Sequence, residues 1–155
     1  MAAIRLATPA DAPALARLRY DFRASIGEAI EDRDAFVDRC SAWMAPRLDG
    51  SSPWRCWVAE LNGRLIGHLW LYVLEKIPNP TPEAEWHAYI TNVYVDPAHR
   101  GGTGTALVEA AMAFAREHGA DSAILWPTEG SRSLYHRFGF TPPGDILEAV
   151  ITEGR

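Results

Sequence analysis

The chain has 155 residues, 48% of them hydrophobic and 23% charged, which is typical of one small globular domain with a substantial core, and we therefore expect a single domain over residues 1–155. Its formal net charge of -5 disfavours a nucleic-acid partner, and its apolar runs are of strand length, too short to cross a membrane. Two cysteines and the lack of a basic, apolar leader favour a reduced, cytoplasmic protein without a disulfide framework or a metal site.

The first half of the sequence predicts a short strand, two helices and a hairpin. Either Thr8-Pro9 or Asp11 can cap the first helix, because the Thr8 or Asp11 side chain can accept from the free amides of the first turn. The pair Asn62-Gly63 favours a tight hairpin turn, since both residues tolerate positive φ. The predicted elements are a strand at 4–6, a helix that ends near Gly27, a helix at 32–48, and strands at 54–61 and 65–74.

The second half predicts strands that alternate with helices. Pro78, Pro80 and Pro82 form a stiff loop that separates the hairpin from the next strand, and Gly119 ends the following long helix as a C-terminal cap. The predicted elements are a strand at 86–95, a helix at 102–118, a strand at 123–126, a short helix around Leu134 and Tyr135, and a last strand at 145–152.

A turn rich in glycine joins the strand that ends at Val95 to the long helix. Gly101, Gly102 and Gly104 allow the backbone to approach an anion closely, because they lack a Cβ. The start of the helix supplies unpaired amides and partial positive charge, and Arg100 adds a full charge. The turn is therefore predicted to hold a phosphate or a diphosphate.

Two common nucleotide-binding motifs do not match this turn. A Walker loop needs a lysine followed by Ser or Thr after its last glycine, whereas Thr105-Ala106 stand there. A dinucleotide fingerprint needs a third glycine, where this chain has Leu107, and an acid after the next strand, whereas Asp121 precedes that strand. A nucleotide-dependent oxidoreductase is therefore a disfavoured alternative.

Two segments of the chain resemble motifs of the GNAT superfamily of acetyl-CoA-dependent N-acetyltransferases. The first is Val93-Tyr94-Val95 with residues 100–107, and the second is the strand 123–126 with Ser131, Leu134-Tyr135 and Gly139-Phe140. The resemblance implies an α/β (α+β) fold with a mixed, mostly antiparallel twisted sheet flanked by helices on both faces. It also implies direct transfer of an acetyl group from acetyl-CoA to a primary amine of a small molecule or peptide. A non-catalytic acyl-CoA-binding or sensing module is the alternative.

The same resemblance implies where coenzyme A is held. In relatives, the strand that matches 86–95 separates from its neighbour at a bulge, and its freed backbone groups pair with the pantetheine arm. This chain differs from the family pattern at Thr103 and Thr105, where glycines are usual, and at Thr128, where an asparagine is common. The implied contacts are Val93, Tyr94, Val95, Arg100, Gly101, Gly102, Thr103, Gly104, Thr105, Thr128 and Ser131.

The sequence indicates the catalytic acid more clearly than the catalytic base. Tyr135 is the expected general acid, because the matching tyrosine of relatives lies near the thioester sulfur and a phenol can protonate a thiolate; aromatic packing is the alternative. Relatives carry a glutamate midway along the strand at 86–95, and this chain has none there. Glu85 and His87 are the candidate bases, since strand alternation puts them on the face of Tyr89 and Thr91. Ordered water alone is a further possibility.

The acceptor is expected near the first two helices and their connection, which shape the acceptor pocket in relatives. The candidate acceptor contacts are Glu28, Trp43, Tyr89 and Asn92. Acids beside aromatic residues suit a cationic amine. Amino acids, polyamines, aminoglycoside-like antibiotics and a protein N-terminus all stay open as acceptors, and exposed terminal strands could pair two copies into a homodimer.

Overall fold

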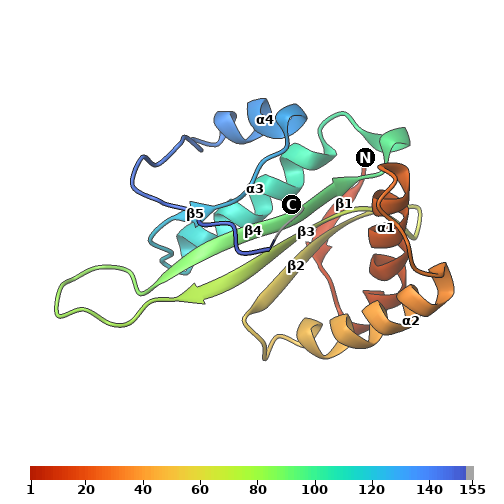
Figure 1. The fold of residues 1–155 in the computed structure, drawn as a ribbon, viewed down its shortest axis with the longest axis horizontal. Helices are drawn as coiled ribbons and strands as arrows, with labels where there is room; N and C mark the ends of the chain where they lie inside the picture. The colour runs from red at the N-terminus through yellow and green to blue at the C-terminus, as the bar shows by residue number, and fades with distance from the viewer. Residues whose placement is uncertain (153–155) are drawn as a thin grey trace.

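A five-stranded sheet carries helices on both of its faces in the computed structural model, which describes residues 1–152 (Figure 1). The strands are β1 (Ala3–Leu6), β2 (Trp54–Leu61), β3 (Arg64–Glu75), β4 (Trp86–Val95) and β5 (Ala123–Ile124). The helices are α1 (Ala12–Ser25), α2 (Arg33–Met44), α3 (Thr103–Glu117) and α4 (Arg132–Arg137), with 3-10 turns η1 (Pro9–Asp11), η2 (Ala45–Leu48), η3 (Pro97–His99) and η4 (Glu129–Ser131). Among these helices none has the length and apolarity that a bilayer crossing requires.

The strands lie in the order in which they occur along the chain. Neighbouring strands from β1 to β4 are antiparallel, and β4 and β5 are parallel. The predicted fold class, a mixed and mostly antiparallel sheet flanked by helices, is therefore confirmed. The loop between β3 and β4 projects from the body of the molecule (Figure 1).

Each face of the sheet has its own core, because successive side chains of a strand point to opposite faces. On one face, Val58 and Trp70 pack with Leu15 of α1, and α2 completes this layer. On the other face, Leu71 and Ile90 pack with α3, and residues of α4 join them. The central strands β3 and β4 therefore separate two apolar layers, and a residue on either strand faces one layer or the other.

Most predicted elements are present, with ends shifted by a few residues. Asn62 and Gly63 adopt φ of 51° and 74°, as the predicted hairpin turn requires. The expectation of a last strand at 145–152 is wrong, because residues 141–152 form neither helix nor strand and are exposed. A strand there would need a ladder partner, but β5 is only two residues long, and Pro142 and Pro143 have no amide to donate.

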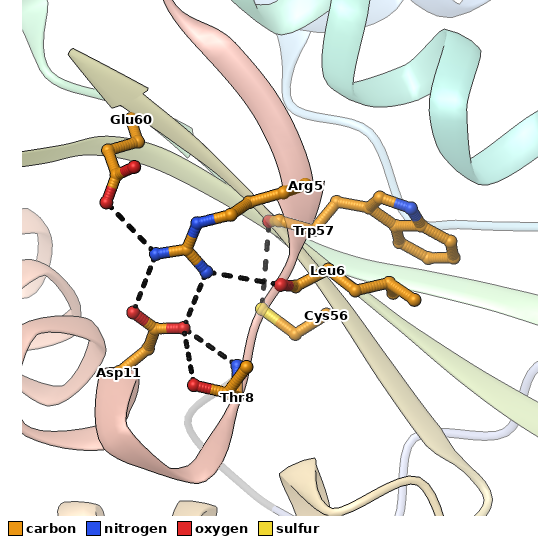
Figure 2. A network of polar contacts seen from close by, with 7 residues as sticks. All are labelled: Arg5, Leu6, Thr8, Asp11, Cys56, Trp57 and Glu60. Carbon is orange, nitrogen blue, oxygen red and sulfur yellow. Dashed lines mark hydrogen bonds and ion pairs between the residues drawn. The ribbon is translucent and has the colours of Figure 1, made fainter.

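A polar network fixes the start of the chain to the sheet (Figure 2). Arg5 of β1 donates to both carboxylate oxygens of Asp11, at 2.8 and 3.0 Å, and to Glu60 of β2 at 3.1 Å. The amide of Thr8 donates to the same Asp11 carboxylate at 2.7 Å. The Arg5 guanidinium therefore lowers the pKa of Asp11. This network sets the turn from β1 into α1.

Candidate active site

Two residues of β4, Asn92 and Val93, lie opposite a single residue of β3, Leu69, because the register of the two strands shifts there. This is a β-bulge. Asn92 adopts φ of 54°, in the left-handed region that asparagine tolerates better than most residues. Because the bulge reverses the side-chain alternation, Tyr94 faces the α1–α2 layer, where its ring lies 5.9 Å from that of His68, and Val93 packs on the α3 layer.

The outer edge of β4 is open on both sides of this bulge. Pairing with β5 is confined to Ala88 with Ala123 and Tyr89 with Ile124, after which the chain turns away toward α4 (Figure 1). Within residues 1–152, no residue of β4 from 91 to 95 has a strand partner along this edge. Unpaired backbone donors and acceptors are strong binding groups. The edge therefore offers a ligand a strand-like surface of N–H and C=O groups.

The glycine turn follows directly at the end of β4. Gly101 and Gly102 have φ of 122° and 99°, a conformation that side chains disfavour. The amides of residues 101–105 donate to no backbone or side-chain acceptor within the described chain. Arg100 is exposed beside them, with its Nε 3.5 Å from the carbonyl oxygen of Val95. Free amides at the start of a long helix, together with a cation, form an arrangement that suits a diphosphate.

Tyr135 lies in the α3 layer, near the same end of α3. Its side chain is buried, and its ring packs edge-on against Phe140 with the centroids 5.8 Å apart. A Cβ on Gly104 would lie 3.7 Å from Leu134, so α4 contacts the first turn of α3. Burial raises the pKa of the Tyr135 phenol, which therefore keeps its proton. The structure thus groups Tyr135 with the glycine turn.

Thr128 and Ser131 begin η4, the turn that leads into α4. The Thr128 amide donates to Ser131 Oγ at 2.9 Å, and Ser131 Oγ donates to the Thr128 carbonyl oxygen at 3.0 Å. These contacts satisfy local backbone groups at the start of a helical segment. In the structure both side chains therefore serve the turn that positions Tyr135.

Glu85 and His87 lie at the other end of β4 from the bulge. Glu85 is exposed, and His87 Nδ1 is 2.8 Å from Ser122 Oγ and 3.9 Å from Asp121 Oδ2. Five residues of extended strand separate His87 from Asn92, which is about 16 Å at roughly 3.3 Å per residue. The structure does not bring these two candidate bases together with the bulge and the glycine turn.

A cavity of about 350 Å³ lies on the opposite face of the sheet from Tyr135, between α1, α2 and the strands. Its lining includes Arg19 from α1, Phe36 and Trp43 from α2, Trp54 and Trp70 from the sheet, and Asn92 from the bulge. Of the candidate acceptor contacts, Trp43 and Asn92 line this cavity. Glu28 is instead ion-paired with Arg23 beside it, and Tyr89 packs against Trp126 at 5.4 Å.

The sequence reasoning did not find Arg19 or His68. Arg19 lies one helical turn after Leu15, which is fully buried. This spacing places a charged residue on the apolar face of the first helix, and that placement could have indicated a functional role for Arg19. Its Nη1 donates to Asn92 Oδ1 at the bulge. His68 is 2% exposed, and neither ring nitrogen has a hydrogen-bond partner within residues 1–152. No sequence pattern identifies that position, because its burial depends on the pairing of β3 with β4.

Comparison with known proteins agrees with this geometry. Residues 18–140 match the model of the Acetyltransferase (GNAT) family. A GCN5-related N-acetyltransferase from Ralstonia eutropha JMP134 is 31% identical, with a TM-score of 0.76 over 97% of this chain and 99% of that protein. A predicted acetyltransferase from Clostridium acetobutylicum, crystallised with acetyl-CoA, is 24% identical with a TM-score of 0.74 over 97% of this chain and 96% of that one, and it shares the fold.

An uncharacterized N-acetyltransferase of Methanocaldococcus jannaschii is 34% identical over an alignment 92 residues long that covers 54% of this chain. The aligned segment spans only 37% of the length of that relative. The GNAT family uses acetyl-CoA as its co-substrate. The bulged strand, the free amides at the start of α3 and the family match lead to one conclusion: this chain belongs to the GNAT acetyltransferase family and is an acyltransferase.

Proposed function

We propose that residues 1–155 form one domain that moves an acetyl group from acetyl-CoA to a primary amine by direct attack. The observation that carries this proposal is the bulge of β4. Its backbone edge is open toward the glycine turn, while Asn92 lines a cavity on the opposite face. A donor on one side of β4 and an acceptor on the other would therefore meet at a single point of the strand.

The free amides of residues 101–105 and the charge of Arg100 would hold the diphosphate of coenzyme A. They fit this role because no acceptor within residues 1–152 occupies those amides. The open edge at Val93, Tyr94 and Val95 would hold the pantetheine arm by backbone pairing, as an added strand would. Thr128 and Ser131 act indirectly in this proposal, by fixing the turn before α4.

Chemistry at the bulge requires two proton movements. Tyr135 would donate to the departing thiolate, because its buried phenol is protonated and so has a proton to give. The acceptor amine must lose a proton before or after its attack. Because Glu85 and His87 lie far along the strand, we assign the amine proton to water rather than to either side chain. Holding the two reactants together supplies much of the acceleration.

Release of free thiol from acetyl-CoA in the presence of a panel of amines tests the proposal. We expect Tyr135→Phe to keep the affinity for acetyl-CoA, measured by calorimetry, and to lower kcat by about 100- to 10,000-fold, the usual range for loss of an acid. Gly102→Val should abolish acetyl-CoA binding, since φ of 99° is strained for valine. Gly50→Val is the matched control, because Gly50 has a similar φ of 88° but lies in the turn before β2 and not in the glycine turn.

Two results would contradict this function. Tight acetyl-CoA binding without thiol release for any amine would favour the non-catalytic sensing module. An unchanged affinity of Gly102→Val for acetyl-CoA would show that the glycine turn is not part of the cofactor site.

A further inference from the structure

We propose that the acceptor is a free α-amino acid with an apolar or aromatic side chain, and that Arg19 binds its carboxylate. This inference rests on the proposed acetyl transfer and names the substrate class of that same site. It is carried by an arginine without a counter-ion, in a cavity that holds no acid and is lined by indole rings.

Arg19 differs from the other arginines around this cavity. Arg23 pairs with Glu28, Arg33 with Asp21 and Arg39 with Glu31. Arg19 is half-buried and takes part in no ion pair within residues 1–152, and its one hydrogen bond is to the amide oxygen of Asn92.

Most donors of the Arg19 guanidinium are therefore uncommitted. A partly buried charge without a partner is costly, and a guanidinium has five N–H donors arranged to bind a carboxylate through two of them. The missing counter-charge is what a carboxylate ligand would supply.

The charged residues that line the cavity, Arg19 and Arg39, disfavour a ligand of high positive charge. None of the lining residues is an aspartate or a glutamate. Glu28, the acid that the sequence offered for a cationic amine, is engaged by Arg23 instead. A polyamine or an aminoglycoside would bring further positive charge toward Arg19 and Arg23, which share the nearby Glu28, and this is unfavourable at a partly buried site.

The apolar part of the cavity is a cluster of three tryptophans. Trp43 lies 5.8 Å from Trp54 and 6.2 Å from Trp70, and Trp54 lies 5.8 Å from Trp70, as ring centroids. Phe36 extends this wall. Indole faces favour contact with apolar or aromatic side chains over contact with water. The cavity therefore fits an acceptor that is anionic at one end and apolar at the other.

The position of Arg19 beside the bulge favours free amino acids over peptides as acceptors. Arg19 contacts Asn92, so a carboxylate on its guanidinium lies beside the bulge. In an α-amino acid the amine is attached to the carbon next to the carboxylate, which puts the nitrogen at the bulge as well. A peptide N-terminus has a neutral amide in place of that carboxylate and loses the ion pair. A free amino acid therefore matches both the positive charge of Arg19 and the position of Arg19 beside the bulge.

Three probes with the same ring test the inference: L-phenylalanine, L-phenylalaninamide and phenethylamine. We expect kcat/KM, from thiol release, to be higher for L-phenylalanine than for either other probe by about 10- to 100-fold, the value of hydrogen bonds to a charged group. Arg19→Gln should lower kcat/KM for L-phenylalanine by a similar factor but should not lower that for phenethylamine, which has no carboxylate to lose. Arg19→Lys, which keeps the charge but loses the two-point contact, should be intermediate.

Arg33→Gln is the matched control, because Arg33 belongs to the same helix pair, is ion-paired and does not line the cavity. It should keep the preference for L-phenylalanine. Equal or better turnover of phenethylamine by the unmodified protein would overturn the inference. So would an Arg19→Gln variant that loses both substrates alike while its thermal unfolding and acetyl-CoA affinity are unchanged.

Calorimetry with the protein saturated by coenzyme A separates this inference from the proposed reaction. Binding of L-phenylalanine that exceeds binding of phenethylamine, and that is lost in Arg19→Gln, supports the carboxylate site whether or not turnover follows. Selective binding without thiol release would then count against acetyl transfer alone. Thiol release without any preference for the carboxylate would count against the amino-acid site alone.

Discussion

Acidification should destabilise this protein through one buried histidine, His68. Burial is the main cause that lowers its pKa from 6.5 to about 4; the nearby charge of Arg19 contributes to this shift, and the backbone of Asn92 opposes it. In the unfolded chain the imidazole is exposed and returns to its ordinary pKa. Between these two values the unfolded state binds more protons than the folded state, so the free energy of unfolding rises with pH. The contribution of His68 is complete above pH 6.5 and is lost as the pH falls toward 4.

The size of this contribution follows from the two pKa values. The interval from 6.5 to about 4 corresponds to about 3 kcal/mol, at about 1.4 kcal/mol per pH unit. His68 is 2% exposed, so solvent screening does not reduce the figure appreciably. For a domain of this size the total stability is about 5–15 kcal/mol, which makes the effect easy to measure.

Urea unfolding followed by tryptophan fluorescence, at several pH values between 4.5 and 7.5, measures it. The non-titrating variant His68→Leu should lose less stability on acidification than the unmodified protein, by about 2–3 kcal/mol over that range. Carboxylates titrate in both proteins and cancel in the difference. His136→Gln, at an exposed position, is the control and should follow the unmodified protein. Parallel curves for His68→Leu and the unmodified protein would refute the reasoning.

Three further predictions concern the fold. Gly67→Ala should lower the free energy of unfolding by about 1–3 kcal/mol, because a Cβ there would lie 2.9 Å from a backbone oxygen of β4, whereas Gly130→Ala should change it by less than about 0.5 kcal/mol in the same denaturant assay. Asp11→Ala and Arg5→Ala should show a coupling energy above about 0.5 kcal/mol in a double-mutant cycle, and additive effects would argue against the network of Figure 2. Asn92→Val should cost about 1–2 kcal/mol through backbone strain at φ of 54°, and Asn92→Gly should cost less; equal melting temperatures would contradict this.

Features that depend on neighbouring residues were predictable from the sequence. The hairpin at Asn62-Gly63 and the glycine turn at 101–104 each require positive φ. Asparagine and glycine tolerate positive φ better than other residues, so the residue types alone indicate these turns. The family resemblance added the bulge of β4, which no residue type in that strand specifies. The end of β4 at Val95 was likewise clear, since Pro97 and the glycines follow it.

Features that depend on distant pairing were not predictable. The tail at 145–152 has an apolar composition suited to a strand, but strand formation depends on a partner edge, and β5 is too short to provide one. Arg19 and Asn92 are 73 residues apart, and only the packing of α1 on the sheet brings them into contact. The same separation explains why Glu85 and His87 were plausible as bases in a strand pattern, although they lie far from the bulge.

The division of the molecule by β3 and β4 into two apolar layers has a consequence for how such an enzyme diversifies. The donor is expected on the α3 layer and the acceptor on the α1–α2 layer, and the two layers share few side chains. Substitutions in α2 can therefore change which acceptor binds while the expected contacts with coenzyme A stay the same. A selection experiment that randomises only cavity positions of α2, such as Phe36 and Trp43, should recover new acceptors at undiminished affinity for acetyl-CoA.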